Sequence, residues 1–467
     1  MKKVLRSICI LALSCPALFA QDASVGATAA TGQTINTVVS FAGNNGNPGF
    51  PSGSLAQGRD GDIYGTSSFS NTIWKVTPAG SISLLYDFGP NQSGFPGVTL
   101  GRDGKLYGVS QGGNGGVGTV WSFDPMTMVF TTLYTFSGPD GFSPQGALTQ
   151  GADGNFYGTT NSTTSGHPGE AFKITPAGKL TILHTFAGGP TDGAFPTGPL
   201  FLSIDGNFYG TTTGGGAFSN NGTVYKMSPS GKVTLLHSFN GTDGQSAFSG
   251  VIQAADGSFY GSTQLGGANN QGTVFKVTGS KKFTSLHSFS LALDGGDIAY
   301  YGLAQTTDGN LYGVTTDCAS GGCDGNGILY KIGAKGVFSV FGNFTNIPPH
   351  GDVGPNSPPL AHTDGSLYGT TQQGGVNGYG TFYTLSTTVA PFVTVQTRSG
   401  KAGTTVNILG QGFNSATAVA FNGVAASFNI VSDTFMTATI PALAKTGYVT
   451  VTTAGGVLKS GEKFRQF

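Results

Sequence analysis

Acidic side chains and histidines are the residues of this sequence that could perform acid–base chemistry or hold a metal, and both are scarce. Only 9% of the 467 residues are charged, and the glutamates are Glu170 and Glu462. Most of the aspartates recur at equivalent places of a repeat, and a residue that every unit needs is best explained as a turn former. A general acid and a general base must face one reacting bond, so few residues qualify for catalysis.

The acids that stand outside the repeat pattern offer no pair for such chemistry. They are Glu170, Asp297, Asp317, Asp324 and Asp352. No two of them lie close together when mapped onto the repeat, so no acid–base pair is predicted. Asp317 and Asp324 flank a short loop and could hold calcium, but they lack the regular ligand spacing of a calcium loop. The sequence therefore predicts no catalytic residue, no metal site, no cofactor and no enzymatic activity.

Three of the six histidines occupy one recurring strand position, where other repeats place Val39, Tyr86 or Tyr134. These histidines are His184, His237 and His287. A position that accepts Val, Tyr and His is typical of packing between repeats rather than of a ligand cluster. No Ser-His-Asp or Cys-His arrangement and no phosphate-binding glycine motif can be identified.

Internal repetition sets the architecture that positions these residues. A hexapeptide of the form Asp-Gly-x-[Ile/Leu/Phe]-Tyr-Gly recurs at intervals of 43 to 56 residues, beginning at Asp60, Asp103, Asp153, Asp205, Asp256, Asp308 and Asp364. Around each copy the same order returns: an apolar segment, the Asp-Gly turn, the Tyr-Gly strand, a Gly/Asn-rich loop and two further strands. Each unit thus holds four short strands, called A to D.

Turn chemistry and the pleat predict how these strands pair. Asp-Gly between two β segments favours a hairpin, and a hairpin makes antiparallel neighbours. The tyrosine of each hexapeptide and the apolar residue before it point to opposite faces, so each sheet must be covered on both faces. A ring of sheets stacked face to face, the β-propeller, meets that demand. We expect an all-β fold with a seven-bladed β-propeller over residues 34–388, four antiparallel strands per blade.

The ends of the repeat region predict how the ring closes. Residues 34–41 form a D-type strand with no A, B or C strand before it, and residues 380–385 form a C-type strand with no D strand after it. We expect the N-terminal strand to complete the last blade, which leaves no free sheet edge.

One recurring feature predicts a binding surface. Aromatic residues come just before strand A in six repeats: Phe50, Phe95, Phe142, Phe195, Phe248 and Tyr300. Propeller geometry places these D–A loops on the same face as the B–C loops and opposite the Asp-Gly hairpins. The aromatics either plug the spaces between blades or form a stacking platform at the central channel for a sugar ring or another flat ligand.

The repeat also resembles a known family. The Asp-Gly-x-[Leu/Phe]-Tyr-Gly core, the following Gly-Gly pairs, Gly-Thr-Val-[Phe/Tyr]-Lys and the Leu-His-[Ser/Thr]-Phe strand are similar to the GloVer-type (Gloeo_Verruco) tandem repeat of secreted bacterial proteins. The resemblance covers about 350 residues. It implies the fold and export, and no established activity.

After residue 390 the periodicity ends, and short alternating strands predict an Ig-like β-sandwich. Residues 391–467 resemble the IPT/TIG domain, notably in Gly410-x-Gly412-Phe413, Ile440-Pro441 and the final Val-x-Val of residues 449–451. In extracellular bacterial proteins the resemblance implies a spacer or a binding module. We expect a spacer packed beside the ring.

Composition excludes several classes of protein. Glycine supplies 79 residues, aromatics 11% and hydrophobic residues 38%, with a formal net charge of zero. Without a basic excess a nucleic-acid partner is not expected, and this apolar content argues against disorder. Scarce Glu, Lys and Arg with abundant Gly, Thr, Phe and Tyr disfavour a helical protein.

The N-terminus predicts export. Residues 1–20 combine Lys2, Lys3 and Arg6 with a short apolar run over residues 8–13 and small residues up to Ala20, as in a signal peptide. A lipid anchor at Cys15 is the alternative, but Pro16 follows it. No stretch approaches the ~20 apolar residues of a membrane span. Residues 21–33 are then a linker, and we expect a monomer in the periplasm or the medium.

Removal of the signal peptide would leave two cysteines, Cys318 and Cys323. In an oxidising compartment their spacing predicts a local disulfide worth roughly 2 kcal/mol, and a metal site without a histidine pair is the weaker alternative.

The predicted function is non-enzymatic binding of a glycan or an extracellular protein on the loop-rich face. A structural envelope or matrix protein and a propeller-type polysaccharide lyase or glycosidase are the alternatives.

Overall fold

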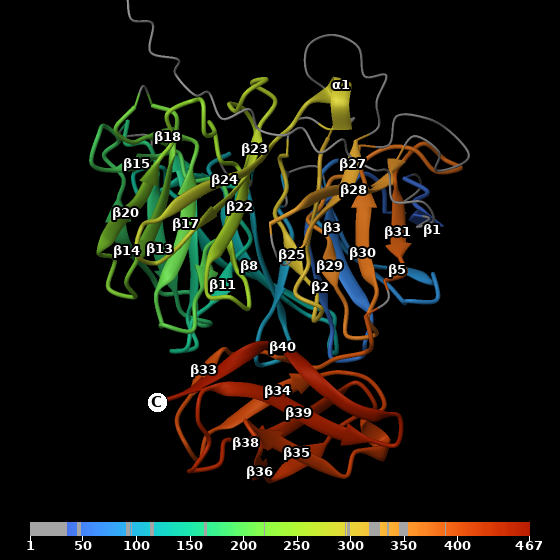
Figure 1. Ribbon diagram of the computed structural model, residues 1–467. Helices are drawn as coiled ribbons and strands as arrows, with labels where there is room; N and C mark the ends of the chain where they lie inside the picture. Colours follow the sequence, from blue (N-terminus) through green and yellow to red (C-terminus); the bar gives the residue numbers. More distant parts are fainter. Residues whose placement is uncertain are drawn as a thin grey trace, which may run out of the picture.

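The computed structural model describes residues 35–43, 48–89, 94, 96–112, 116–162, 166–218, 220–294, 296, 299–316, 327–333, 336–344, 354–387 and 389–467. Strands dominate these residues, and α1 (Leu291–Asp294) is a single helical turn. Figure 1 shows a ring of small sheets with a separate sandwich beneath it. Among the described helices, none is long and apolar enough to cross a membrane.

The Asp-Gly hairpins have one shared backbone geometry, which the first hairpin illustrates. The Gly61 N–H donates to the Gly58 carbonyl at 3.3 Å, and the Gly58 N–H donates to the Asp62 carbonyl at 2.8 Å. Gly61 has φ 84°, a left-handed conformation that suits glycine. A turn followed by a left-handed glycine is a common three-residue hairpin connection, and it explains why glycine follows aspartate in each copy.

Each repeat folds into an antiparallel sheet in the order A-B-C-D, as predicted. The first three sheets are β2 (Pro51–Gln57), β3 (Ile63–Ser67), β4 (Thr72–Val76) and β5 (Ile82–Asp87); β6 (Val98–Leu100), β7 (Leu106–Ser110), β8 (Thr119–Asp124) and β9 (Val129–Thr135); and β11 (Thr149–Gln150), β12 (Phe156–Ser162), β13 (Glu170–Ile174) and β14 (Leu180–Thr185), with β10 (Phe142–Pro144) also on β12.

The next three sheets repeat this order. They are β16 (Phe201–Leu202), β17 (Phe208–Thr212), β19 (Thr223–Met227) and β20 (Val233–Ser238); β21 (Ile252–Gln253), β22 (Phe259–Thr263), β23 (Thr273–Val277) and β24 (Phe283–Ser288); and β25 (Ala304–Gln305), β26 (Leu311–Val314), β27 (Ile328–Ile332) and β28 (Phe338–Asn343). A two-stranded ribbon of β15 (Gly193–Ala194) and β18 (Gly214–Gly215) lies on the loop side of the fourth sheet.

The last sheet joins the two ends of the repeat region. It contains β29 (Leu360–Ala361), β30 (Leu367–Thr371), β31 (Thr381–Leu385) and, on the outer edge, β1 (Ile35–Ser40). Ile35 pairs with Leu385 and Ser40 with Thr381 in an antiparallel register. The predicted pairing of the first strand with the last is therefore confirmed, and it locks the ring.

Neighbouring sheets pack face to face through the residues that the pleat assigns to opposite faces. Tyr107 of the second sheet stacks on Phe156 of the third at 3.9 Å, and Tyr209 of the fourth stacks on Phe259 of the fifth at 3.7 Å. The glycine after each of these tyrosines makes room for an aromatic of strand C, as at Gly65, where a Cβ would lie 2.3 Å from the Trp74 ring. The Tyr-Gly dipeptide is thus a packing motif between blades.

The C-terminal part is a sandwich of two sheets. One sheet contains β32 (Thr394–Val395), β34 (Thr405–Leu409), β38 (Phe435–Thr439) and β37 (Phe428–Ile430), and the other contains β33 (Ser399–Gly400), β40 (Gly456–Gln466), β39 (Gly447–Thr453), β35 (Ala418–Phe421) and β36 (Val424–Ala426). The 3-10 turn η2 (Phe413–Ser415) lies in the connection from β34 to β35, and Phe413 and Val449 are among the buried core residues of the sandwich.

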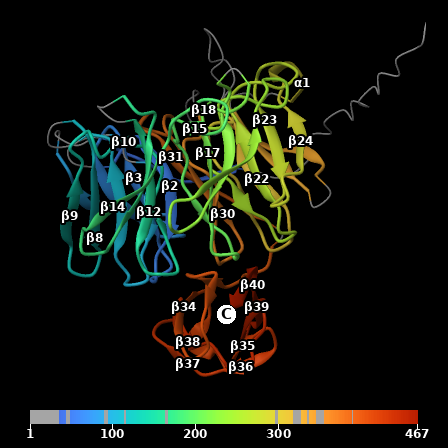
Figure 2. The same ribbon diagram turned by 90° about the vertical axis from the view of Figure 1, so that its left-hand side faces the viewer.

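The sandwich lies across the hairpin face of the ring, at one end of the central channel, rather than beside the ring as the sequence led us to expect (Figures 1 and 2). Hairpin carbonyls accept hydrogen bonds from it: Thr434 donates to Arg59, Asn407 to Arg102 and Arg465 to Ile204, at 2.6, 2.9 and 3.1 Å. These three carbonyls belong to the first, second and fourth sheets, so the sandwich is held across the ring.

Candidate functional site

The hairpin aspartates form a repeated structural network. In six hairpins one carboxylate oxygen accepts a hydrogen bond from the tyrosine hydroxyl four residues later, at 2.7 to 3.0 Å. The other oxygen accepts the backbone N–H two residues later, as at Asp205 and Asn207, 2.9 Å apart. Burial raises the pKa of Asp205, but hydrogen bonds from Lys226, the Asn207 N–H and Tyr209 outweigh it and lower the pKa from 3.8 to about 2. These carboxylates therefore have a structural role in the hairpins.

The three histidines of the D strands also make structural contacts. His237 stacks on Phe283 of the next sheet with ring centroids 3.6 Å apart, and His287 stacks in the same way on Phe338 at 3.5 Å. Each histidine Nε2 also lies 2.7 to 3.1 Å from a recurring aspartate of the D–A loop, the pairs being His184–Asp192, His237–Asp243 and His287–Asp294. Sequence reasoning found the packing and missed the contact with aspartate, although the two partners recur six to eight residues apart in these three repeats.

A cavity of about 350 Å³ opens where the central channel meets the loop-rich face. Its described walls come from residues at or just before the A strands of seven sheets and from Ser68 and Gln111. Phe248, Tyr300 and Tyr301 supply the aromatic part, and Gln111, Gln145 and Asn356 supply amide groups. Among the described lining residues, none has a charged side chain. This cavity, called the loop-face cavity, is the candidate binding site.

An aromatic pair forms one wall of the loop-face cavity. Phe248 and Tyr300 stack with ring centroids 4.6 Å apart and planes 23° apart, and Tyr300 remains 36% exposed. Tyr301 packs edge-on against Tyr300 and donates from its hydroxyl to the Asn356 side-chain oxygen. The Asn356 amide nitrogen donates in turn to the Pro51 carbonyl at 3.1 Å. Residues from both ends of the ring thus hold one wall in place.

The six aromatics that the sequence grouped together occupy different places. Phe248 and Tyr300 line the loop-face cavity, whereas Phe50, Phe142 and Phe195 do not. Phe50 packs edge-on against Phe69 and Tyr379, Phe142 lies in β10, and Phe195 is 39% exposed away from the cavity. Phe95 lies outside the described residues.

Backbone conformation separates these aromatics into two kinds of position. Phe50 and Phe195 have φ of 52° and 58°, and their N–H groups donate to the carbonyls of Tyr379 and Pro168 in the preceding blade's B–C loop. Phe248 and Tyr300 come two residues before the glycines of their A strands, at the inner wall. In the sequence, the number of residues between the aromatic and this glycine distinguishes the two kinds of position.

A ring of glycines lies at the starts of the A strands, and several of its members line the loop-face cavity. A Cβ on Gly198 would lie 2.3 Å from the Gly250 nitrogen, and one on Gly250 would lie 2.3 Å from the Pro199 carbonyl oxygen. Neighbouring A strands therefore approach at a distance that only glycine permits. Sequence reasoning missed this ring, although in six of the seven repeats a glycine lies within three residues of the start of strand A.

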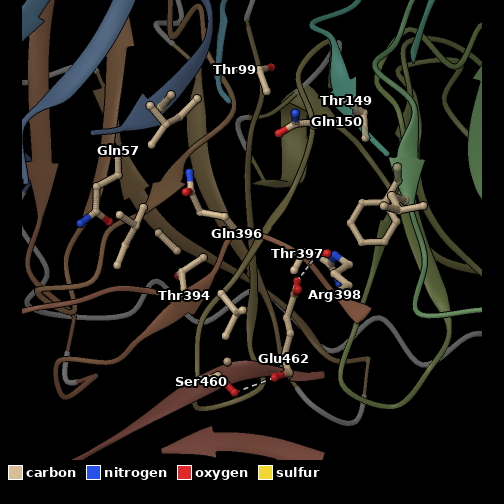
Figure 3. Close-up of a pocket in the computed structure, with 18 of the residues that line it drawn as sticks. Gln57, Thr99, Thr149, Gln150, Thr394, Gln396, Thr397, Arg398, Ser460 and Glu462 are labelled. Carbon is tan, nitrogen blue, oxygen red and sulfur yellow. Dashed lines mark hydrogen bonds and ion pairs between the residues drawn. The ribbon is translucent and has the colours of Figure 1, made fainter. Parts of the chain in front are cut away.

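On the far side of the glycines lies a second cavity of about 480 Å³, between the ring and the sandwich (Figure 3). We call it the interdomain chamber. Its ring side includes Leu148 and Leu200, one residue further along the strands whose Ala147 and Pro199 line the loop-face cavity. Its sandwich side includes Val395 and Arg398. The channel thus has two compartments, one open at the loop-rich face and one between the ring and the sandwich.

The remaining candidates from the sequence do not add a site. Glu170 lies on β13 and accepts a hydrogen bond from Thr185 at 3.3 Å, and burial raises its pKa. It lines neither cavity. Asp297, Asp317, Asp324, Asp352, Cys318 and Cys323 lie outside the described residues. Within the described part of the chain, no cluster of three His, Cys, Asp or Glu side chains suits a metal ion.

These observations define an all-β protein of the β-propeller class with an Ig-like sandwich over one face of the ring. Comparison of the sequence with family models then identifies both parts. The Gloeobacter/Verrucomicrobia repeat matches residues 23–218 and 198–426, and the IPT/TIG domain matches residues 391–465. The chain belongs to the Gloeobacter/Verrucomicrobia repeat family and carries a C-terminal TIG domain.

Solved structures support the fold alone. Virginiamycin B lyase from Staphylococcus aureus is 14% identical with a TM-score of 0.54, over 76% of this chain and 100% of the lyase. A streptogramin B lyase is 13% identical with a TM-score of 0.52, over 76% of this chain and 96% of that protein. A search of the curated proteins finds no match.

Proposed function

We propose that the protein is an exported, non-enzymatic glycan-binding protein that holds a sugar ring in the loop-face cavity. The stacked pair of Phe248 and Tyr300 carries this proposal, because Tyr300 keeps a partly exposed aromatic ring at the wall of an open cavity. The apolar face of a sugar ring packs against such a surface, and nearby amide groups hydrogen-bond its hydroxyls.

The chemistry of the cavity favours a neutral glycan. Its described walls offer hydroxyl, amide and aromatic groups and no cationic side chain. A uronate or sulfated sugar would lose hydration of its charge there without gaining a charged partner, which is costly. A cavity of about 350 Å³ is in the range of small-ligand sites, and its concave shape suits one or two sugar rings better than a protein surface.

The same lining supports binding rather than turnover. Polysaccharide lyases and glycosidases require a general acid and base at the bond that breaks. The described residues around the loop-face cavity include no carboxylate or imidazole that could take either role.

The TIG domain acts in this proposal as a rigid spacer. It covers the hairpin face, so the open end of the channel points away from whatever the C-terminal domain adjoins. Export follows from the signal-peptide features of residues 1–20.

A glycan array with the full chain tests the proposal. We expect binding to one class of neutral oligosaccharide and at least tenfold weaker binding to uronate-containing or sulfated glycans. Incubation with the bound glycan, followed by chromatography of the products, should return the substrate intact. The absence of binding to any glycan, or a preference for anionic glycans, would overturn the binding proposal, and cleavage products would overturn the non-enzymatic part.

A further inference from the structure

About half of the side chains that line the interdomain chamber are aliphatic or aromatic. Leu148, Leu200 and Leu360 belong to the inner strands of the ring, and Phe392 and Val395 belong to the segment that enters the TIG domain. The chamber measures about 480 Å³, which is in the range of small-molecule sites. Apolar walls of this kind accept the apolar part of a ligand.

The polar side chains of the ring wall are already engaged in joining blades. Gln150 accepts the Arg102 N–H at 2.9 Å and donates to the Gly154 carbonyl at 3.0 Å. Thr99 donates to the Leu148 carbonyl at 2.6 Å. These amide and hydroxyl groups therefore leave mainly methyl and methylene groups to meet a ligand.

The charged side chains on the sandwich wall of the chamber are the Arg398–Glu462 ion pair and the exposed Lys463 (Figure 3). Arg398 donates to Glu462, and the Arg398 guanidinium lies 4.2 Å from the centre of the Phe201 ring. The Glu462 side chain is 43% exposed, so the pair remains accessible from solvent. Because the two charges neutralise each other, the pair suits a neutral head group that accepts from Arg398 and donates to Glu462. A carboxylate head placed at Arg398 would lie next to Glu462, which already accepts from Arg398, whereas Lys463 is exposed to solvent.

We propose that the interdomain chamber is a second binding site, for a neutral amphiphile with a linear aliphatic body and a hydroxyl head. The aliphatic body lies among the leucines of the ring and the valine of the TIG domain, and the hydroxyl meets the Arg398–Glu462 pair. The TIG domain then has a role in binding beyond that of a spacer.

Titration calorimetry of the full chain with octan-1-ol and with octanoate tests this inference. We expect octan-1-ol to bind with a stoichiometry of one and octanoate to bind at least tenfold more weakly. Thr394 is exposed and lines the chamber, so the Thr394→Trp variant should weaken octan-1-ol binding at least tenfold by filling the space. Thr405 is an exposed threonine of the same domain outside the chamber, and Thr405→Trp should leave binding unchanged.

The outcomes separate this site from the loop-face cavity. Tyr300→Ala should not alter octan-1-ol binding, so a failure of the glycan proposal leaves this inference testable. The Glu462→Gln variant removes the repulsion and should narrow the preference against octanoate. Absence of octan-1-ol binding, equal affinity for both probes, or binding that Thr394→Trp does not weaken would overturn the inference.

Discussion

The two faces of the propeller ring differ in how closely they follow the repeat. On the hairpin face each aspartate, glycine and tyrosine of the hexapeptide recurs, and six aspartate–tyrosine bonds repeat within 0.3 Å of one another. The loop-rich face is irregular: among the described residues, the fifth and sixth repeats place an aromatic at the inner wall, and Asn356 stands in the last. The difference teaches that the residues that recur in each repeat hold the ring together, whereas the residues of the candidate site are those that differ from one repeat to the next.

The largest effect is expected from the seam that closes the ring. Phe41 is fully buried, packs against Trp74 at 5.0 Å and directly follows the strand that pairs with β31. Phe41→Ala should lower the free energy of unfolding by about 3–5 kcal/mol, as large buried aromatics do. Guanidinium unfolding followed by tryptophan fluorescence measures it. Phe69, which is 69% exposed on the loop-rich face, is the control, and Phe69→Ala should cost less than about 0.5 kcal/mol. Equal losses in the two variants would contradict the account.

The glycine ring provides the next test, because its members differ in the space around them. A Cβ on Gly250 would lie 2.3 Å from a backbone oxygen, whereas one on Gly302 would meet its nearest atom at 3.8 Å. Gly250→Ala should therefore destabilise by about 1–3 kcal/mol through overpacking, and Gly302→Ala should not. Thermal unfolding of the two variants side by side measures the difference. A stable Gly250→Ala protein would show that the strands are not in close approach.

The hairpin hydrogen bonds predict a smaller effect. Tyr209 donates to Asp205 at 2.9 Å, so Tyr209→Phe removes one hydrogen bond and should cost about 1 kcal/mol. Tyr300→Phe, at the loop-face cavity, removes a hydroxyl from a partly exposed ring and should leave stability within about 0.5 kcal/mol. Chemical denaturation of both variants compares the two faces directly, and a larger loss at Tyr300 would reverse the assignment of roles.

The same hairpin sets the acid dependence of stability. The pKa of Asp205 lies below 3.8 in the folded chain, at about 2, so its contribution is fully present above pH 4 and is lost as the pH falls towards 2. Asp205→Asn should reduce stability at pH 7 and make the decline between pH 4 and 2 shallower. Because the carboxylate is 37% exposed, solvent screening keeps the effect below about 1 kcal/mol. Parallel pH profiles of both proteins would refute the lowered pKa.

Much of the fold could be predicted from the sequence because one physical constraint recurs. The Asp-Gly dipeptide determines the hairpin between strands A and B, and the tyrosine with the residue before it shows that both faces of strand B are buried. The first strand and the last strand of the repeat region each lack a partner within their own repeat, which predicts that they pair and close the ring. The position of the TIG domain could not be predicted, since it depends on single hydrogen bonds such as that from Asn407 to the Arg102 carbonyl. No periodicity encodes such a bond.

The candidate site was only partly predictable for a related reason. Phe195 and Tyr300 look equivalent as aromatics before strand A, but their ring directions depend on the left-handed conformation of Phe195 and on the distance to the next glycine. Asn356, which interrupts the aromatic series, proves to be the residue that holds Tyr301 and Pro51 together. Its role follows from contacts across the closure of the ring, between residues about 300 positions apart in the sequence.

The central claim is that the loop-face cavity binds glycan through its aromatic wall, and paired affinity measurements test it most directly. Tyr300 and Phe195 are 36% and 39% exposed on the same face, but only Tyr300 lines the cavity. Calorimetry with the glycan selected by the array should show at least tenfold weaker binding for Tyr300→Ala and unchanged binding for Phe195→Ala. Equal affinities for the two variants, or a loss confined to Phe195→Ala, would contradict the claim.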